Sequence, residues 1–183
     1  MLCIAGVLVA SPCFAQNPST NSAPHDPDRE SLLSLPWRQF DQTANSGWHI
    51  YNDRKQYLQA AKLIEAYLIR HNELNERERA ISNFHAAKEY IALALEYGGD
   101  NQAALPHLDQ AIVSKESGMS ADWNDLVIVT KAFLTGDRTT LLLVKDRIAA
   151  MPPGTRKWLK EPYGVEGYLD NLGKPYGSWW PKE

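Results

Sequence analysis

Residues 75–112, NERERAISNFHAAKEYIALALEYGGDNQAALPHLDQAI, contain the pattern that decides the fold. Asn75 and Glu78 have the spacing of a capping box, which predicts that a helix begins at this point. Apolar residues then recur at steps of three and four, as on one helical face: Ile81, Phe84, Ala87, Ile91, Ala94 and Leu95, followed after a turn by Ala104, Leu108, Ala111 and Ile112. Gly98-Gly99 predicts the end of the first helix, because glycine adopts the left-handed conformation common there, and Asp100 predicts the cap of the second. The stretch therefore predicts two antiparallel helices joined by a short turn.

The same periodicity continues on both sides of this hairpin. It predicts four more helices: residues 36–51, 57–68, 122–134 and 141–149. Polar or glycine-containing turns separate them, at Asn52-Asp53 and Gly136-Asp137. The sequence shows no alternating apolar and polar pattern of the kind that predicts a strand. Residues 35–151 are therefore predicted to form an all-α domain of three helical hairpins.

Composition and charge exclude a basic nucleic-acid-binding protein. The chain has 183 residues, of which 22% are charged, and these values are typical of one ordinary globular domain. A protein that binds nucleic acid carries an excess of Lys and Arg, which neutralises phosphate charge. This chain has 19 Lys and Arg residues against 22 Asp and Glu, a net charge of −3. We therefore expect no nucleic-acid partner.

The first 15 residues predict export. Leu2–Ala10 is an apolar run too short to span a bilayer of about 30 Å. Cys13-Phe14-Ala15 places small residues at the two positions that signal peptidase recognises. Residues 1–15 are therefore predicted to be a signal peptide, with Gln16 as the first residue of a periplasmic or secreted protein. Cleavage would remove both cysteines of the chain, so we expect a mature protein with no disulfide and no stable membrane span.

Two segments that flank the predicted helical domain lack helical periodicity. Residues 16–34 are rich in Asn, Ser, Pro and Asp, which predicts a disordered linker. Residues 152–183 combine several Pro and Gly with six aromatic residues. We interpret them as an irregular, aromatic-rich segment that caps the helical domain. The alternative is an exposed aromatic platform for a sugar or a peptide.

Residues 86–117, AAKEYIALALEYGGDNQAALPHLDQAIVSKES, resemble a tetratricopeptide repeat (TPR). Ala92 occupies the small position at which the first helix meets its partner, and Gly99 occupies the turn. Small residues are needed where helices pack, because they let the backbones approach within about 8–10 Å. The second helix has the small–large–small pattern of the family at Ala104, Leu108 and Ala111. The resemblance implies antiparallel hairpins in a TPR-like right-handed array. The alternative is an irregular helical bundle that contains one repeat-like hairpin.

The resemblance also implies a binding surface. TPR arrays bind partners on a concave face that is formed by the first helix of each hairpin. The groove positions of the family, carried onto this sequence, are Glu89, Leu93, Glu96 and Tyr97 in the best-matching hairpin and Asn45, His49 and Asn52 in the preceding one. Such a groove would be mildly acidic and amide-lined, which suits a basic or polar partner. We therefore expect an exported scaffold that binds a protein or peptide partner in the cell envelope, such as an assembly factor or a toxin that it neutralises as an immunity protein.

The sequence lacks the motifs that would predict catalysis or metal binding. None of the five histidines forms the His-Glu-x-x-His pattern of a zinc hydrolase, and there is no Gly-x-Ser-x-Gly elbow or phosphate-binding glycine loop. His85 and His107 could meet across two helices, but a pair of histidines without a placed carboxylate makes a poor metal site. We therefore expect no enzyme, no cofactor and no metal. The alternative is a cell-wall glycan-binding or glycan-cleaving protein that uses the aromatic C-terminal segment.

Overall fold

The computed structural model describes residues 28–152, residue 159 and residues 164–179. All regular secondary structure in this part of the chain is helical, which confirms the predicted all-α class. The predicted signal peptide, residues 1–15, lies outside the described residues. The α-helices are α1 (Arg29–Leu33), α2 (Trp37–Asp41), α3 (His49–Asn52), α4 (Tyr57–Arg70), α5 (Glu76–Tyr97), α6 (Leu105–Gln110), α7 (Trp123–Thr135), α8 (Arg138–Ala150) and α9 (Val165–Asp170), and two 3-10 turns are η1 (Gln102–Ala104) and η2 (Lys115–Ser117).

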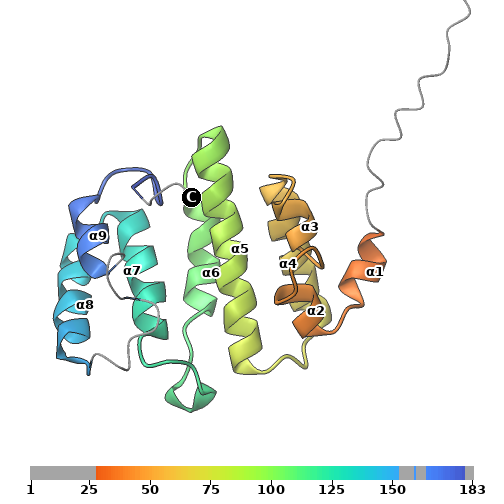
Figure 1. Cartoon of the computed structure of the whole chain (residues 1–183), viewed down its shortest axis with the longest axis horizontal. Coiled ribbons are helices and arrows are strands. Elements are labelled where there is room, and N and C mark those ends of the chain that lie inside the picture. The colour runs from red at the N-terminus through yellow and green to blue at the C-terminus, as the bar shows by residue number, and fades with distance from the viewer. Residues whose placement is uncertain (1–27, 153–158, 160–163, 180–183) are drawn as a thin grey trace, which may run out of the picture.

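The helices follow one another across the molecule, with α5 in the centre (Figure 1). Helices α1 to α4 lie on one side of α5 and helices α6 to α9 on the other. The most extensive contact between helices is that of α4 with α5. None of the helices in the described part of the chain is both long and apolar enough to span a membrane.

Helix α5 separates two hydrophobic cores, and paired alanines allow it to serve both. Ala86 belongs to the core formed with α1–α4, and its neighbour Ala87 belongs to the core formed with α6–α9. Helix α4 divides in the same way, with Ala60 in the first core and Ala61 in the second. All four side chains are fully buried. Their small size lets α4 and α5 approach closely, because helix separation depends on the side chains at the contact.

The predicted limits of α5 are confirmed by its caps. The Glu78 backbone N–H donates to Asn75 Oδ1 at 2.9 Å, and the Asn75 N–H donates to Glu78 Oε2 at 3.2 Å. These two bonds satisfy donors that a helix start leaves without intrahelical partners. At the other end Gly98 has a φ of +75°, and the helix stops at Tyr97. The capping signals therefore fixed both ends of the longest helix.

The helix predicted over residues 36–51 is wrong, because the chain forms two short helices there, α2 and α3. The turn between them has positive φ at Asn45 (+56°) and at Gly47 (+53°). A Cβ at Gly47 would lie 1.9 Å from the carbonyl oxygen of Phe40, so only glycine fits this position. The periodicity of the apolar residues survives the break because α2 and α3 both face the same core, which contains Phe40, Trp48 and Tyr51.

The linker predicted over residues 16–34 ends earlier than expected. Residues 29–33 form α1, whose start is capped by the Asp28 side chain. Leu32 and Leu33 are buried against α4, and His71 Nε2 lies 2.8 Å from the Leu33 carbonyl oxygen. Two adjacent leucines at the end of a polar segment therefore anchor the chain to the core. The remainder of the predicted linker, residues 16–27, lies outside the described residues.

The described part of the C-terminal segment packs its aromatic residues against α7. Phe133 of α7 has the rings of Tyr168, Tyr176 and Trp179 around it, with centroid distances of 5.8, 5.7 and 4.8 Å. The hydroxyl groups of Tyr168 and Tyr176 lie 3.2 Å apart. Tyr168 and Tyr176 are both buried, so their rings extend the second core. Trp158, Tyr163 and Trp180 lie outside the described residues.

We predict that Ala104→Leu overpacks the contact between η1 and α5. Ala104 is fully buried and faces α5, whereas Ala92, the small position of the TPR resemblance, is only half-buried. Extra methylene groups in a closely packed core cost about 1–3 kcal/mol. Thermal unfolding should show this loss for Ala104→Leu, and the neighbouring Ala103→Leu, at an exposed position, serves as the matched control. Equal stabilities for the two variants would contradict the packing described here.

Candidate functional site

A groove along α5 is the best-defined candidate for a binding site. It has a volume of about 490 Å³. Its α5 residues occur at i, i+4, i+7, i+8 and i+11, which is one stripe of a helix surface. We call this the α5 groove and define it by its lining residues: Arg77, Ile81, Phe84, His85 and Lys88 of α5, Gln42 after α2, and Gly118, Met119, Ser120 and Trp123 before and at the start of α7.

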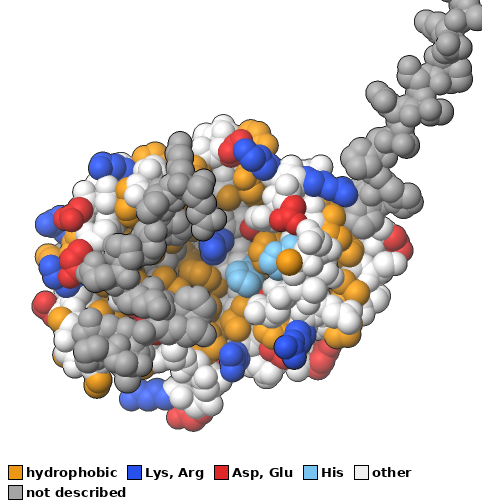
Figure 2. Space-filling model, viewed as in Figure 1, with side chains coloured by type: hydrophobic (Ala, Val, Ile, Leu, Met, Phe, Trp, Pro, Cys, Tyr) orange, Lys and Arg blue, Asp and Glu red, His pale blue; other side chains and the backbone are white. Residues whose placement is uncertain are grey.

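The α5 groove combines an apolar floor with positive charge. Phe84 and Trp123 pack edge to face at a centroid distance of 5.3 Å, and both side chains are buried. Arg77 and Lys88 are exposed, and neither forms an ion pair with any residue that the structure describes. The face of the molecule in Figure 2 carries histidine side chains near its middle, with apolar and Lys or Arg side chains beside them. No Asp or Glu belongs to the set of lining residues that defines the groove.

A buried carboxylate behind the groove holds its wall in place. Asp41, at the end of α2, is only 1% exposed. Its Oδ1 accepts a hydrogen bond from Ser82 Oγ at 2.8 Å, and its Oδ2 accepts one from Gln42 Nε2 at 2.5 Å. His85 Nδ1 lies 3.2 Å from the same Oδ2. Trp37 Nε1 donates to Ser82 Oγ at 3.0 Å, which extends the network to the first residue of α2.

These contacts keep Asp41 ionised. Burial raises the pKa of Asp41, but the nearby His85 ring and the hydrogen bonds from Ser82 and Gln42 lower it by more than burial raises it, so the net pKa lies below its usual value. The Nδ1 edge of the His85 ring faces this carboxylate. The opposite Nε2 edge is therefore the part of the ring that the groove can offer to a ligand. Trp48 holds the ring from the side, at a centroid distance of 5.1 Å.

A second buried carboxylate, that of Glu89, lies on α5 itself, one turn after His85. Glu89 is 3% exposed, and its Oε1 accepts a hydrogen bond from Asn52 Nδ2 at 2.8 Å. Its Oε2 is buried and has no hydrogen-bond partner among the described residues. Burial raises the pKa of Glu89 to about 7, although the Asn52 hydrogen bond and the nearby Lys88 and His85 charges oppose this rise. Glu89 is therefore a buried acid that changes charge near neutral pH.

The residues predicted from the TPR resemblance fall into separate places. Asn52 and Glu89 are brought together by their hydrogen bond. Glu96 and Tyr97 meet Lys55 instead: Lys55 Nζ lies 3.4 Å from Glu96 Oε1, and Tyr97 Oη donates to the Lys55 carbonyl at 3.5 Å.

The other three predicted residues do not join these pairs. His49 Nε2 lies 3.1 Å from the Asp41 carbonyl oxygen. Leu93 is partly buried against the second core, and Asn45 is exposed in the turn between α2 and α3. The predicted set therefore does not form one continuous surface.

Sequence reasoning missed Arg77, His85 and Lys88 as neighbours in one groove. Their signal was the i, i+8 and i+11 spacing, which places the three basic residues on one stripe. The two histidines that were expected to be able to meet do not, because His85 contacts Asp41 whereas His107 contacts other groups. Nothing in the local sequence pairs Asp41 with His85, because the two residues are far apart in the chain.

His107 belongs to a cluster that ties three helices together. Glu65 of α4 accepts hydrogen bonds from Lys62 Nζ at 2.8 Å and from Tyr90 Oη of α5 at 2.6 Å, and His107 Nε2 of α6 lies 3.2 Å from it. Burial raises the pKa of Glu65, but these three partners lower it by more than burial raises it. The pKa of Glu65 therefore lies below its usual value. His107 Nδ1 lies 3.1 Å from Asn83 Oδ1. Because these groups already bond one another, we assign the cluster a structural role.

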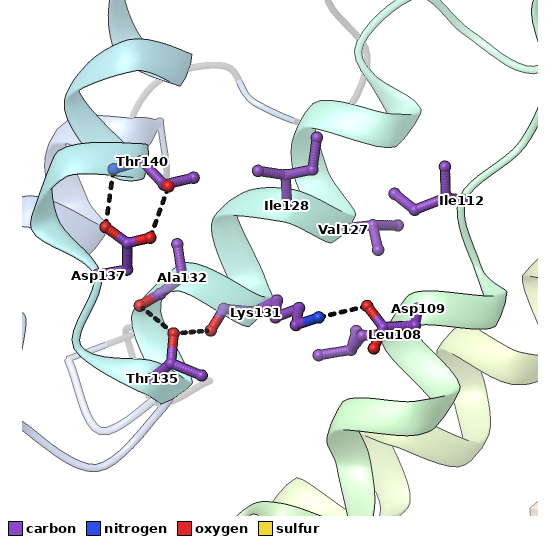
Figure 3. A pocket seen from close by; sticks show the side chains of 10 residues that line it. All are labelled: Leu108, Asp109, Ile112, Val127, Ile128, Lys131, Ala132, Thr135, Asp137 and Thr140. Carbon is purple, nitrogen blue, oxygen red and sulfur yellow. Dashed lines mark hydrogen bonds and ion pairs between the residues drawn. The ribbon is translucent and has the colours of Figure 1, made fainter.

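A second pocket, between α6, α7 and the start of α8, has its polar groups paired internally (Figure 3). Its volume is about 290 Å³. Lys131 of α7 points toward Asp109 of α6 and forms an ion pair with it. Asp137 accepts hydrogen bonds from the Thr140 backbone N–H and hydroxyl group. A ligand there would have to compete with these bonds. The α5 groove is the better candidate, because its cations have no ion-pair partner in the part of the chain that the structure describes.

We predict that Glu89→Gln removes a pH dependence of stability. The unfolded chain loses the Glu89 proton near the ordinary pKa of 4.5, whereas the folded protein keeps it until about pH 7. Stability should therefore fall as the pH rises from 4.5 to 7, and the loss should persist above pH 7. At 1.36 kcal/mol per pKa unit, the loss amounts to about 3 kcal/mol.

Chemical denaturation of the wild type, Glu89→Gln and Glu96→Gln between pH 4 and 8 measures this effect. Glu96 is exposed, so its variant should keep the wild-type pH profile. The difference in stability between Glu89→Gln and the wild type should grow with pH and level off above 7. A difference that stays constant from pH 4 to 8 would show that the Glu89 pKa is not raised.

In comparisons with known proteins, no family model, no curated protein and no solved structure matches this chain. Three or more potential metal-ligating side chains do not cluster anywhere in the described part of the chain. The chemistry of the α5 groove is therefore the main guide to function.

Proposed function

We propose that this protein is an exported helical scaffold that binds an acidic, partly apolar peptide segment of a protein partner in the α5 groove. The observation that carries the proposal is the pair of cations, Arg77 and Lys88, which border the groove without ion-pair partners among the described residues. Elsewhere in the described chain some exposed cations, such as Lys55, pair with a carboxylate and others, such as Arg138, do not. The position of Arg77 and Lys88 beside an apolar groove is therefore what distinguishes them. Complementary charge on a partner would favour both the rate and the specificity of binding.

An acidic partner is favoured over the basic or polar one that the TPR resemblance implies. Glu89 is buried beside Asn52, and Glu96 already pairs with Lys55. Neither carboxylate is thus readily available to a ligand. In this proposal the hairpins stack antiparallel in a TPR-like right-handed array, and the partner lies along α5.

The floor of the groove supports a partner with apolar side chains. Ile81 and Met119 are partly buried, and they flank the buried rings of Phe84 and Trp123. Methionine adapts its shape to different partners because its side chain is unbranched and flexible. Binding pockets commonly combine such an apolar lining with a few polar groups that fix orientation. These features support binding rather than catalysis as the role of the groove.

The glycan alternative has less support. It needs exposed aromatic faces on the C-terminal segment, since sugars stack on such faces. Tyr168 and Tyr176 are buried around Phe133, so their rings pack into the core and are not exposed for a sugar to stack on. The cell envelope as the place of action rests on the leader-like sequence of residues 1–15.

Selection of displayed random peptides on the immobilised protein tests the proposal. We expect the wild type to enrich peptides that carry Asp or Glu beside apolar residues, and we expect added salt to weaken their binding. The double variant Arg77→Glu/Lys88→Glu should lose this enrichment. Arg138→Glu, an exposed charge reversal at the start of α8, should keep it.

Two results would refute the proposed function. The first is the same set of enriched peptides on the wild type and on the double groove variant. The second is enrichment of Lys- or Arg-rich peptides on the wild type. Circular dichroism of each variant establishes that its helices remain folded.

A further inference from the structure

The two cations of the α5 groove have a fixed spacing. Arg77 and Lys88 are eleven residues apart on one continuous helix, which corresponds to about 16 Å along its axis at 1.5 Å per residue. They lie on the same stripe of α5, with Ile81 and Phe84 between them. The groove therefore presents positive charge near both ends and an apolar floor in the middle.

An extended ligand suits the shape of the groove, which follows one stripe of α5 from Arg77 to Lys88 with Met119 and Ser120 beside it. An extended chain is thinner than a helix, which is about 10–12 Å across with its side chains, and every second side chain points to the same face. It can therefore direct alternate side chains into the groove and leave the others in solvent.

We infer that the groove recognises an extended segment with two acidic side chains four residues apart and a large apolar side chain midway between them. This inference rests on the proposed function and adds the spacing of the partner's residues. Four residues of extended chain span about 13 Å. The long side chains of Arg77 and Lys88 can lean inward to cover the difference from 16 Å. Residues at i, i+2 and i+4 share one face, so the apolar side chain would lie over Ile81 and Phe84 while the carboxylates meet the cations.

A polar group at the side of the groove fits a ligand backbone. Ser120 Oγ is buried and has no hydrogen-bond partner among the described residues. A buried hydroxyl without a partner is unfavourable, and a hydrogen bond from a ligand removes that cost. An extended segment offers backbone N–H and C=O groups along its whole length, because it makes no hydrogen bonds within itself. Ser120 thus provides a second reason to expect an extended ligand.

Fluorescence anisotropy with three labelled peptides tests the spacing. Their core sequences are Glu-Ser-Phe-Ser-Glu, Glu-Glu-Phe-Ser-Ser and the neutral Gln-Ser-Phe-Ser-Gln. The first two have the same composition and charge and differ only in the separation of the acidic residues. We expect the spaced peptide to bind about two- to fivefold more tightly than the adjacent one, as one additional exposed ion pair would give.

Variants of the two cations link this preference to the groove. Arg77→Gln and Lys88→Gln should each reduce binding of the spaced peptide to the level of the adjacent one. Arg138→Gln, outside the groove, should leave the preference for the spaced peptide unchanged. Equal affinities of the two acidic peptides, both above that of the neutral peptide, would overturn the spacing and leave the proposed function in place. Acidic peptides that bind no better than the neutral one would overturn both.

Discussion

The buried carboxylate of Asp41 is the interaction on which the N-terminal half of the structure depends. Removing a charge from water costs several kcal/mol, and the cost is offset only where hydrogen bonds and an opposite charge surround the group. Ser82 and His85 of α5, together with the adjacent Gln42, supply these contacts. They hold the end of α2 against α5. Because Gln42 and His85 also line the α5 groove, the same network shapes the candidate binding site.

Helix α5 explains why the two halves of the protein form one structure. Its small residues Ala86 and Ala87 serve the two cores, and Glu89 faces Asn52 of α3. The stripe from Arg77 to Lys88 lines the groove. Different sides of the helix over this length thus contact the two cores, α3 and the groove, which is why its sequence mixes apolar, small and charged residues. This use of all its sides makes α5 both the centre of the fold and the base of the site.

Helices were predictable from sequence where local signals agree. The capping box at Asn75 and the glycines after Tyr97 marked the ends of α5, and periodicity placed α4, α7 and α8. The break between α2 and α3 was not predictable, because it depends on the contact of Gly47 with the Phe40 carbonyl. The site was predictable only in fragments, such as Asn52 with Glu89. Contacts such as that of Asp41 with His85 join distant parts of the chain, and periodicity gives no information about such pairs.

Hydrogen exchange of the wild type and of Asp41→Asn measures the dependence of the groove wall on the buried carboxylate most directly. Asparagine keeps the shape of the side chain but removes the negative charge that His85 faces. The account predicts faster exchange in α2 of the variant, because this helix loses its main polar contact with α5, whereas α3 keeps the hydrogen bond from Asn52 to Glu89. Exchange in α7, α8 and α9, which lie on the other side of α5, should not change. Wild-type exchange rates throughout α2 of Asp41→Asn would contradict the account.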